Sequence, residues 1–306
     1  MSNNNCSVII LTYNEEQHIQ RCIESVQSFA SNIFVIDSFS KDKTVEIAKS
    51  LGATVLQNPW TNYSKQFQWG LDNAPITSDW IMRLDADEII ETDLAKKIRN
   101  RLPQLKENVV GINIDRKHIF LGKWIKHGGR YPLTLLRIWR RGKGRIEDRW
   151  MDEHIVVKGG KTIKISGGFS DCNLNDITFF TTKHNHYATR EAIDVLNQKY
   201  ALFERDEDLT EGNTPKQAAS KRGFKEKLYN KLPFWVGPFV YFLYRYFLQF
   251  GFLDGREGLI YHFLQGFWYR FLVGAKIYEY ERELIKVSDR SAMLKKLEEM
   301  TGHKLR

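Results

Sequence analysis

Three carboxylates stand close together after an apolar run at residues 80–84. They are Asp85, Asp87 and Glu88, with Ala86 between the first two. In an extended segment alternate side chains point the same way, so Asp85 and Asp87 can face one ligand. Two hard oxygen ligands suit Mg²⁺ or Mn²⁺, and such an ion neutralises the diphosphate leaving group of a nucleotide-activated donor. The alternative is that Asp85 caps a following helix while Asp87 and Glu88 are solvated.

The surrounding chain alternates apolar runs with helical patterns. Runs at 7–12, 33–36, 54–56 and 80–84 predict strands, and the segments between them carry apolar residues at the helical period. This repeated βαβ pattern predicts an α/β, Rossmann-like fold with a mainly parallel central sheet and helices on both faces. Ligands of such sheets bind outside the carboxyl ends of the strands. One rim of the sheet should therefore carry Thr12-Tyr13-Asn14, Asp37 and Asp85-Ala86-Asp87.

Other side chains of this rim suit a nucleotide-sugar. Asp37 follows its strand directly and can accept a hydrogen bond from N3–H of a uracil ring, or cap the following loop. Tyr13 offers a ring face for base stacking, with ordinary packing as the alternative. Lys65 and Arg83 can contact the pyrophosphate or remain surface charges. The candidate nucleotide-sugar contacts are Thr12, Tyr13, Asn14, Glu15, Asp37, Lys65, Arg83, Asp85, Ala86 and Asp87.

Three segments in order carry a family resemblance. VIILTYNEEQHIQRCIESV, FVIDSFSKDKTVEIAK and WIMRLDADE resemble the signature segments of glycosyltransferase family 2, inverting enzymes with the GT-A fold. The resemblance covers roughly residues 6–200. It implies a nucleotide-sugar donor, a divalent ion held by Asp85 and Asp87, and one base that deprotonates the acceptor hydroxyl. By motif position, Asp37 matches the aspartate that recognises the nucleotide base.

The same resemblance directs attention to a later acidic pair as the catalytic base. In an inverting displacement the base is a carboxylate across the donor from the leaving phosphate. The segment RWMDEHI at 149–155 supplies Asp152 and Glu153. Glu153 is preferred because related enzymes with a His-Glu version of this motif keep the glutamate, and Asp152 is the alternative.

A His-Asn-His segment ends at His186. On a strand, His184 and His186 would have the spacing of a metal-ligating pair, which makes His186 a candidate metal ligand. A contact from His186 to a phosphate or to the acceptor is the favoured alternative.

The chain changes character after residue 231. Residues 232–252 and 258–278 are aromatic and apolar, yet Pro238 and Arg245 interrupt the first stretch and Arg270 the second. Interleaved aromatic and basic residues favour a helical hairpin in the plane of the headgroups over a spanning one. A hairpin packed on the catalytic domain is the alternative. We therefore expect a transferase domain at 1–230 and a membrane-associated helical region at 231–306.

The C-terminal stretch adds to the resemblance. LDGREGLIYHFLQGFWYRFLVGAKIYE is similar to the tails of bacterial enzymes that glycosylate the inner core of lipopolysaccharide or other lipid-linked glycans, and LGKWIKHGGRYPLTLLRIWRRGKGR to their acceptor-side segment. This implies transfer of one sugar, from a UDP-hexose, to a hydroxyl of a lipid-linked or lipopolysaccharide-core saccharide. The Q-x-x-R-W motif of processive synthases is missing at Gln265, which favours a single addition. The alternatives are a protein or soluble glycan acceptor, or a non-catalytic membrane-bound scaffold.

Charge and cysteine content complete these expectations. The formal net charge of +9 indicates an anionic partner, and no nucleic-acid-binding motif is visible. We expect the basic segment 123–145 to face an anionic membrane surface together with the hairpin. Three separate cysteines and the lack of a signal-like N-terminus favour a reducing cytoplasm. The predicted location is peripheral or monotopic, on the cytoplasmic face of the inner membrane.

Overall fold

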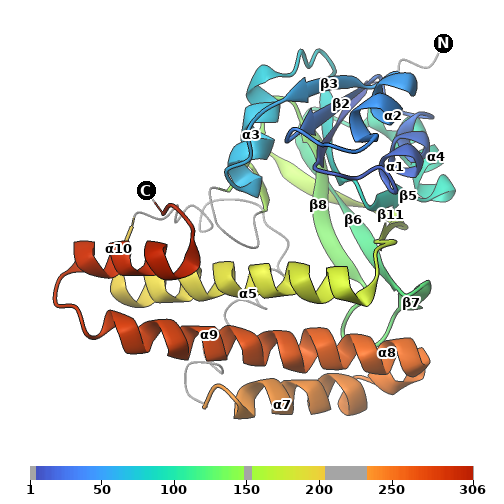
Figure 1. Ribbon diagram of the computed structural model, residues 1–306. Coiled ribbons are helices and arrows are strands. Elements are labelled where there is room, and N and C mark those ends of the chain that lie inside the picture. Colours follow the sequence, from blue (N-terminus) through green and yellow to red (C-terminus); the bar gives the residue numbers. More distant parts are fainter. Residues whose placement is uncertain (1–4, 148–153, 204–232, 306) are drawn as a thin grey trace.

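The protein, seen in a computed structural model, is described for residues 5–147, 154–203 and 233–305. Figure 1 shows two stacked parts, an α/β unit built around a nine-stranded sheet and a layer of long helices below it. The domain boundary predicted between residues 230 and 231 lies outside the described residues, and it remains a prediction.

Half of the sheet is parallel, as the βαβ pattern predicts. Its strands are β1 (Cys6–Thr12), β2 (Asn32–Asp37), β3 (Thr54–Gln57) and β4 (Trp80–Asp85). They pair in the order β3-β2-β1-β4, all parallel. Every residue of β1 is buried, because helices cover both faces. The register pairs Thr12 with Asp37 and Leu11 with Asp85, so the predicted rim is confirmed.

The other half of the sheet is mixed, and here the prediction of a mainly parallel sheet is wrong. Its strands are β5 (Glu88–Ile90), β6 (Val109–Phe120), β7 (Lys123–Ile125), β8 (Leu133–Arg140) and β11 (Lys161–Cys172). β8 is antiparallel to β4 and to β6, β6 is parallel to β11, and β11 is antiparallel to β5. Strands β6, β8 and β11 thus join the sheet, and β7 folds back on β6 as a hairpin. A separate two-stranded sheet holds β9 (Gly144–Ile146) and β10 (Ile155–Val157).

Helices cover both faces of the sheet, as predicted. They are α1 (Ile19–Val26), α2 (Thr44–Ser50), α3 (Tyr63–Asn73) and α4 (Thr92–Arg101), with a 3₁₀ turn at Leu102–Gln104. The apolar stripe of α1 is fully buried with residues of α2 and α4 in one core on one face. α3 buries Phe67 in a second core against Ile9 and Trp139 on the other face.

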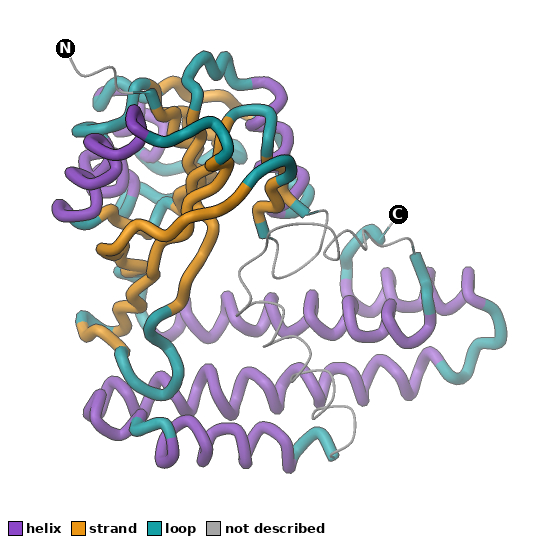
Figure 2. The backbone as a smooth tube through the Cα atoms, turned by 180° about the vertical axis from the view of Figure 1, so that it is seen from behind, coloured by secondary structure: helices purple, strands orange, loops and turns teal. Residues whose placement is uncertain are grey.

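The lower layer is helical. It contains α5 (Ile177–Tyr200), α7 (Val236–Leu243), α8 (Gly255–Tyr261), α9 (Tyr269–Leu284) and α10 (Arg290–Thr301), with π-helical segments Tyr244–Leu248 and His262–Trp268 and a 3₁₀ turn at Gly251–Asp254. Figures 1 and 2 show α5 next to the sheet, α9 beside α5, and α7 on the outer side. Leucines and tyrosines of α5, α9 and α10 form a core of their own. None of the helices in the described ranges combines the length and apolar character needed to span a bilayer.

The hairpin from α7 to α9 docks on the loop between β7 and β8. Asp254 accepts hydrogen bonds from the His127 backbone N–H (2.9 Å) and Nδ1 (2.6 Å). Arg245 Nε donates to the Gly128 carbonyl (2.8 Å). Gly128 has φ +64, and a Cβ there would lie 2.1 Å from the ring of His262. Packing on the catalytic part, the alternative given above for the hairpin, is therefore present, and Arg245 faces this loop and not a solvent-exposed surface.

The basic segment 123–145 does not face one surface, which corrects the expectation. Arg137 is buried beside Glu88. Arg140 donates to the Val109 carbonyl (2.8 Å) near the amino end of β4, opposite the rim. β8 carries these residues along the sheet, so the part of the segment that adjoins the hairpin is the one around β7 and His127.

Candidate active site at the carboxyl ends of the parallel strands

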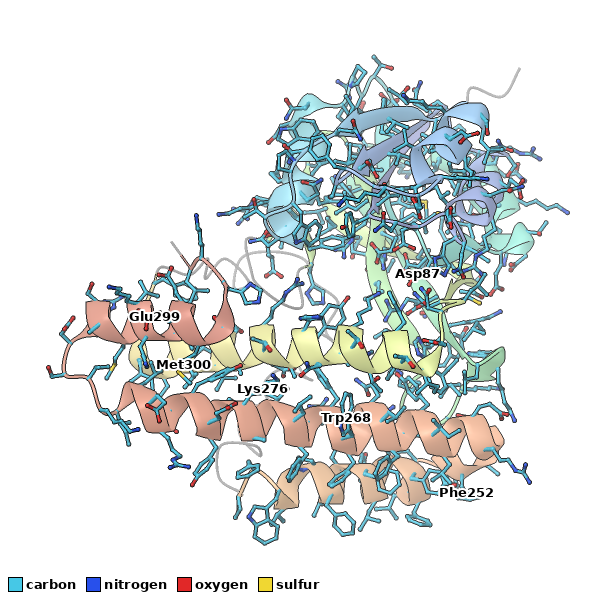
Figure 3. The ribbon with its side chains drawn as sticks, in the orientation of Figure 1. Asp87, Phe252, Trp268, Lys276, Glu299 and Met300 are labelled. Atoms are coloured by element: carbon cyan, nitrogen blue, oxygen red, sulfur yellow. The ribbon has the colours of Figure 1, made fainter. Side chains whose placement is uncertain are left out.

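The Asp85-Ala86-Asp87 turn closes β4 and leads into β5. Ala86 is buried, while both aspartates are partly exposed on the rim. Asp87 Oδ2 accepts from Asn173 Nδ2 (2.9 Å) and lies 4.0 Å from Lys183 Nζ. Figure 3 labels Asp87 at the lower edge of the α/β unit, above α5. The carboxylates thus lie at the mouth of the sheet, next to the helical layer.

Asp85 is held by three neighbours. Tyr63 donates its hydroxyl to Oδ1, Arg137 Nη2 lies 3.5 Å from Oδ2, and Arg83 Nε lies 3.8 Å from Oδ1. Burial acts to raise the pKa of Asp85, but Arg137, Arg83 and the Tyr63 hydrogen bond lower it to about 2. Asp85 does not cap the next helix, because α4 has Glu91 at its N-cap.

Glu88 is buried, so its interpretation as a solvated carboxylate is wrong. It accepts from Arg137 Nη2 (2.6 Å) and from the Asp85 backbone N–H (3.0 Å), and Arg116 Nη1 lies 3.6 Å away. Burial raises the pKa of Glu88 and the charge of Asp85 adds to this, while Arg137 and Arg116 oppose it. Arg137 therefore contacts the carboxylates of both Asp85 and Glu88 and holds the Asp85-Ala86-Asp87 turn in place.

A second acidic group, which the sequence did not single out, continues this network. Asp171 on β11 lies 3.5 Å from Arg116 and 3.1 Å from His118 Nδ1. Burial acts to raise the pKa of Asp171, yet His118 and Arg116 lower it. Arg116 and His118 alternate on β6 and so share one face of the strand. The spacing of Arg116 and His118 was the sequence signal that could have revealed this part of the site. Tyr63, Asn173 and Lys183, which also contact the rim aspartates, gave no such signal.

Asp37 is fully buried and caps the loop after β2. Its oxygens accept from Thr12 Oγ1 (3.0 Å), the Ser40 backbone N–H (2.9 Å) and Gln57 Nε2 (3.0 Å). The loop-capping role, given above as an alternative, is therefore present. The contact to a uracil ring remains a prediction.

The loop after β1 is tied to the loop after β2. Asn14 has φ +55, and its Oδ1 accepts from the Lys41 backbone N–H (2.9 Å). Glu15 accepts at Oε2 from His18 Nδ1 (2.7 Å). Tyr13 is 55% exposed, so ordinary packing does not describe it, and its ring can receive a planar ligand. A pocket of about 370 Å³ adjoins this loop, lined by Asn14, Glu16, Gln17, His18, Lys41, Asp42 and Asn175.

The two basic candidates of the rim differ. Lys65 is exposed near the start of α3, and its backbone N–H is fixed by the N-cap Asn62 (2.8 Å). Arg83 is not a surface charge: its side chain is 12% exposed, lies 4.3 Å from the centre of the Tyr63 ring and donates to the Tyr63 hydroxyl (3.0 Å). Lys65 is therefore the more mobile of the two cations that could approach a pyrophosphate.

His184 and His186 lie on α5, so the strand that a metal-ligating pair with this spacing would require is absent here. Residues two apart on a helix are rotated by about 200° around its axis, so their side chains lie on nearly opposite sides. They therefore cannot bind the same metal ion. His184 Nδ1 is engaged with the Phe180 carbonyl (2.8 Å), and His186 is exposed. Within the described ranges no three His, Cys, Asp or Glu side chains cluster around a potential metal site. His186 as a single ligand stays a prediction.

The candidate bases Asp152 and Glu153 lie outside the described residues. The flanks of their segment are paired, since the Glu147 backbone N–H donates to the His154 carbonyl (3.0 Å) and β9 pairs with β10.

Comparison with known proteins agrees with this geometry. The family described as glycosyl transferase family 2 matches residues 7–163, just over half of the chain. The chain belongs to glycosyl transferase family 2. The matched range includes β1 to β4, the Asp85-Ala86-Asp87 turn and the segment of Asp152 and Glu153, and the enzyme is accordingly a glycosyltransferase.

Individual relatives differ in how much they share. The lipopolysaccharide core biosynthesis glycosyltransferase LpsC of Rhizobium meliloti (strain 1021) is 27% identical over 282 residues, which cover 89% of this chain and 92% of the relative. An uncharacterized glycosyltransferase, RC0292, of Rickettsia conorii (strain ATCC VR-613 / Malish 7) is 37% identical over 63% of this chain and 71% of its own length.

Among solved structures, glucosyl-3-phosphoglycerate synthase from Mycobacterium tuberculosis, in complex with Mn²⁺, UDP and glucosyl-3-phosphoglycerate, matches 45% of this chain and 57% of its own at 18% identity and a TM-score of 0.34. The chain thus spans about half the length of that structure, and the family assignment does not depend on the match.

Proposed function

We propose that this family 2 enzyme moves one hexose from a UDP-sugar to a hydroxyl of a lipopolysaccharide-core or other lipid-linked saccharide, with Mg²⁺ or Mn²⁺. The observation that carries the proposal is the Asp85-Ala86-Asp87 turn at the carboxyl end of β4. Asp85 is kept ionised by Arg137 and Arg83. Asp87 Oδ1 accepts no hydrogen bond from any described residue, so this oxygen is available to a ligand.

The residues present fit a divalent ion of the hard, oxygen-seeking type. One or two carboxylates at the rim, with the remaining positions taken by water and donor phosphates, is the usual arrangement for Mg²⁺. Asp87 is the first candidate, because both oxygens of Asp85 already have partners. When bound, the ion supplies charge neutralisation to the diphosphate leaving group.

The donor would lie across the ends of β1, β2 and β4. Tyr13 would stack on the base, while Asp37 shapes the floor of the base site through Thr12 and the loop after β2. Lys65 would approach the pyrophosphate. The acceptor hydroxyl oxygen attacks the anomeric carbon, the bond to the diphosphate oxygen breaks, and the hydroxyl proton passes to Glu153, or to Asp152.

The proposed acceptor rests on the near-complete alignment with the lipopolysaccharide core glycosyltransferase and on the surface of the hairpin. Many large apolar side chains stay exposed there, which marks an interaction site. We call this set the apolar face: Phe234, Trp235, Phe239, Val240, Leu243, Tyr244, Phe247, Leu248, Phe250, Phe252, Leu253, Leu259, Ile260 and Phe263. Figure 3 places Phe252 at its outer margin, away from the sheet. We infer peripheral or monotopic attachment to an anionic cytoplasmic leaflet, helped by Lys123, Lys126 and Arg256.

Calorimetric titration with UDP tests the donor site. Wild-type protein should bind UDP more tightly with Mn²⁺ than with EDTA. The ratio of the UDP affinity with Mn²⁺ to that with EDTA should be at least about tenfold smaller in Asp87→Ala than in the wild type. That is the lower end of the effect of disturbing a metal site. Asp72→Ala, an exposed aspartate of α3, serves as the matched control. Equal binding by the wild type with Mn²⁺ and with EDTA would overturn the metal assignment.

A further inference from the structure

Basic side chains gather where the hairpin meets the loop after β7. Arg130 Cζ lies 5.2 Å from the ring centre of Tyr261, and Arg245 Cζ lies 5.9 Å from the same ring. Arg245 and Arg270 also flank the ring of Tyr241, at 5.4 Å and 4.4 Å. We call this set the arginine junction: Arg130, Arg245 and Arg270, with His127 and His262.

Negative charge at the arginine junction is scarce. Asp254 is committed to His127 by two hydrogen bonds, and its distance to His262 Nε2 is 3.9 Å. In the described part of the chain, no carboxylate forms an ion pair with Arg130 or Arg245. This contrasts with Arg137 on the rim, which lies 2.6 Å from a Glu88 oxygen.

Several nitrogen atoms of the junction lack partners. Arg130 Nε, Arg245 Nη2 and both ring nitrogens of His262 are buried without a hydrogen bond to any described residue. Arg245 is 2% exposed and His262 0%. A buried donor left unsatisfied costs about 1–3 kcal/mol, and more when it is charged. Such groups in a native protein call for a bound water or ion.

The local electrostatics agree with surplus positive charge. Burial, with the charges of Arg245, Arg130 and His127, lowers the pKa of His262 to about 3. Burial acts to raise the pKa of Tyr241, yet the charges of Arg245, Arg270 and Arg130 bring it below its usual value. An anion among these side chains would relieve the repulsion among the arginines, since the one carboxylate at the junction, Asp254, contacts the two histidines.

We propose that the arginine junction binds a phosphate group, with Arg130 and Arg245 as its main donors. Guanidinium N–H groups match phosphate oxygens, and Arg245 would contribute its Nη2, because its Nε and Nη1 already donate to Gly128 and Gln265. The Arg130 side of the junction is open to solvent, because Arg130 is only partly buried and the His127 side chain is 35% exposed.

The arginine junction adjoins the rim through Tyr261. The His118 ring lies 4.7 Å from that of Tyr261, and His118 Nδ1 bonds to Asp171 (3.1 Å). Arg116 then connects Asp171 to Glu88. The phosphate can therefore belong to the acceptor saccharide or to a lipid headgroup beside it, an assignment that rests on the proposed function.

Binding of inorganic phosphate to the full-length protein tests the site. At matched ionic strength, wild type should show saturable binding by calorimetry, and Arg130→Gln should weaken it at least tenfold. Arg130→Lys, which keeps the charge, should lose less. Lys295→Gln removes an exposed charge of α10 and should bind as the wild type does. Equal phosphate binding by wild type and Arg130→Gln overturns the proposal, as does a loss in Lys65→Gln alone, which would place the phosphate on the rim.

Two further arms separate the sources of the phosphate. If Arg130→Gln also loses affinity for phosphatidylcholine vesicles containing phosphatidic acid, relative to vesicles without it, a headgroup supplies the phosphate. If vesicle binding is unchanged while inorganic phosphate binding falls, the phosphate belongs to a saccharide. UDP binding by Arg130→Gln, measured in parallel, reports on the proposed transferase function alone, so the two proposals can fail independently.

Discussion

The rim and the arginine junction are neighbours with opposite electrostatic designs. At the rim, Asp85, Glu88 and Asp171 alternate with Arg137, Arg116 and His118, so each buried charge has a partner. At the junction, arginines and histidines meet around two tyrosine rings with one carboxylate. Buried nitrogens without a hydrogen-bond partner among the described residues occur in both places, at Arg116 and Arg137 as well as at Arg130 and Arg245. The two networks therefore differ in ion pairing, because the rim arginines have carboxylate partners within 4 Å among the described residues and the junction's Arg130 and Arg245 do not.

The largest effect is expected for the chemistry on the rim side. Glu153→Gln should lower kcat by about two to four orders of magnitude, the usual contribution of a general base, while UDP affinity stays unchanged. Steady-state kinetics with a UDP-sugar donor would measure this. An active Glu153→Gln beside an inactive Asp152→Asn would assign the base to Asp152.

A matched pair of arginine substitutions probes the two charge networks directly. Arg137→Gln removes the buried cation that joins Asp85 to the buried Glu88 and should reduce the free energy of unfolding by about 3 kcal/mol. Arg130→Gln removes repulsion at the junction and should change it by less than about 0.5 kcal/mol, or raise it. Chemical denaturation without phosphate compares them. Equal losses in both variants would show that the junction is compensated like the rim.

Acid should weaken the junction before the rim. The pKa of His262 lies at about 3 in the folded protein, below its ordinary 6.5, mainly because of burial. As pH falls below 6.5, the unfolded chain binds a proton at this histidine and the folded chain does not. The free energy of unfolding therefore decreases, by about 1–2 kcal/mol at pH 5. Asp85, with its pKa lowered to about 2, loses its contribution only as pH falls from 3.8 toward that value.

Thermal or urea unfolding between pH 7 and pH 4 measures this slope. His184, whose pKa burial lowers to about 4, contributes with the same sign. His262→Gln should make the slope shallower while His186→Gln, at an exposed histidine of α5, should not. An unchanged slope in His262→Gln would remove the junction from the pH response.

A smaller effect is expected on the apolar face. Phe250→Ser with Phe252→Ser removes two exposed rings at the hairpin tip and should weaken flotation with anionic liposomes about tenfold, since each buried ring is worth roughly 1.5–3 kcal/mol and insertion is partial. Ile285→Ser, 64% exposed at the end of α9, is the matched control. Wild-type protein that stays soluble with these liposomes would contradict membrane attachment.

The sequence predicted the elements whose determinants are local. The run at 80–84 and its carboxylates placed Asp85 and Asp87 at the end of β4, because strand pattern and charge are both visible over ten residues. The helix at 177–200 also had a local sign, because Asp176 caps it by accepting from the Phe179 N–H (2.8 Å), and this cap places His184 on a helix and not on the strand that a metal-ligating pair would need.

The remainder depends on pairs far apart in the chain. Arg137 meets Glu88 across 49 positions, and Asp254 meets His127 across 127. The order of β6, β8 and β11 in the sheet likewise depends on pairing between distant strands, which the sequence of a single strand does not reveal. A count of basic residues in 123–145 could not separate Arg137, which binds a carboxylate, from Arg130, which contacts no carboxylate among the described residues.

Helices α5, α9 and α7 are stacked between the rim and the apolar face, and this stacking sets the distance between the active site and the surface formed by the apolar face. If the apolar face lies on a bilayer, as proposed, three helices packed about 8–10 Å apart would hold Asp87 on the order of 20–30 Å from that bilayer. A glycan attached to a lipid would then have to be long enough to span this distance before its hydroxyl could reach the donor. Shorter glycans would pass beneath the site, and acceptor choice would then depend on chain length as well as on sugar identity.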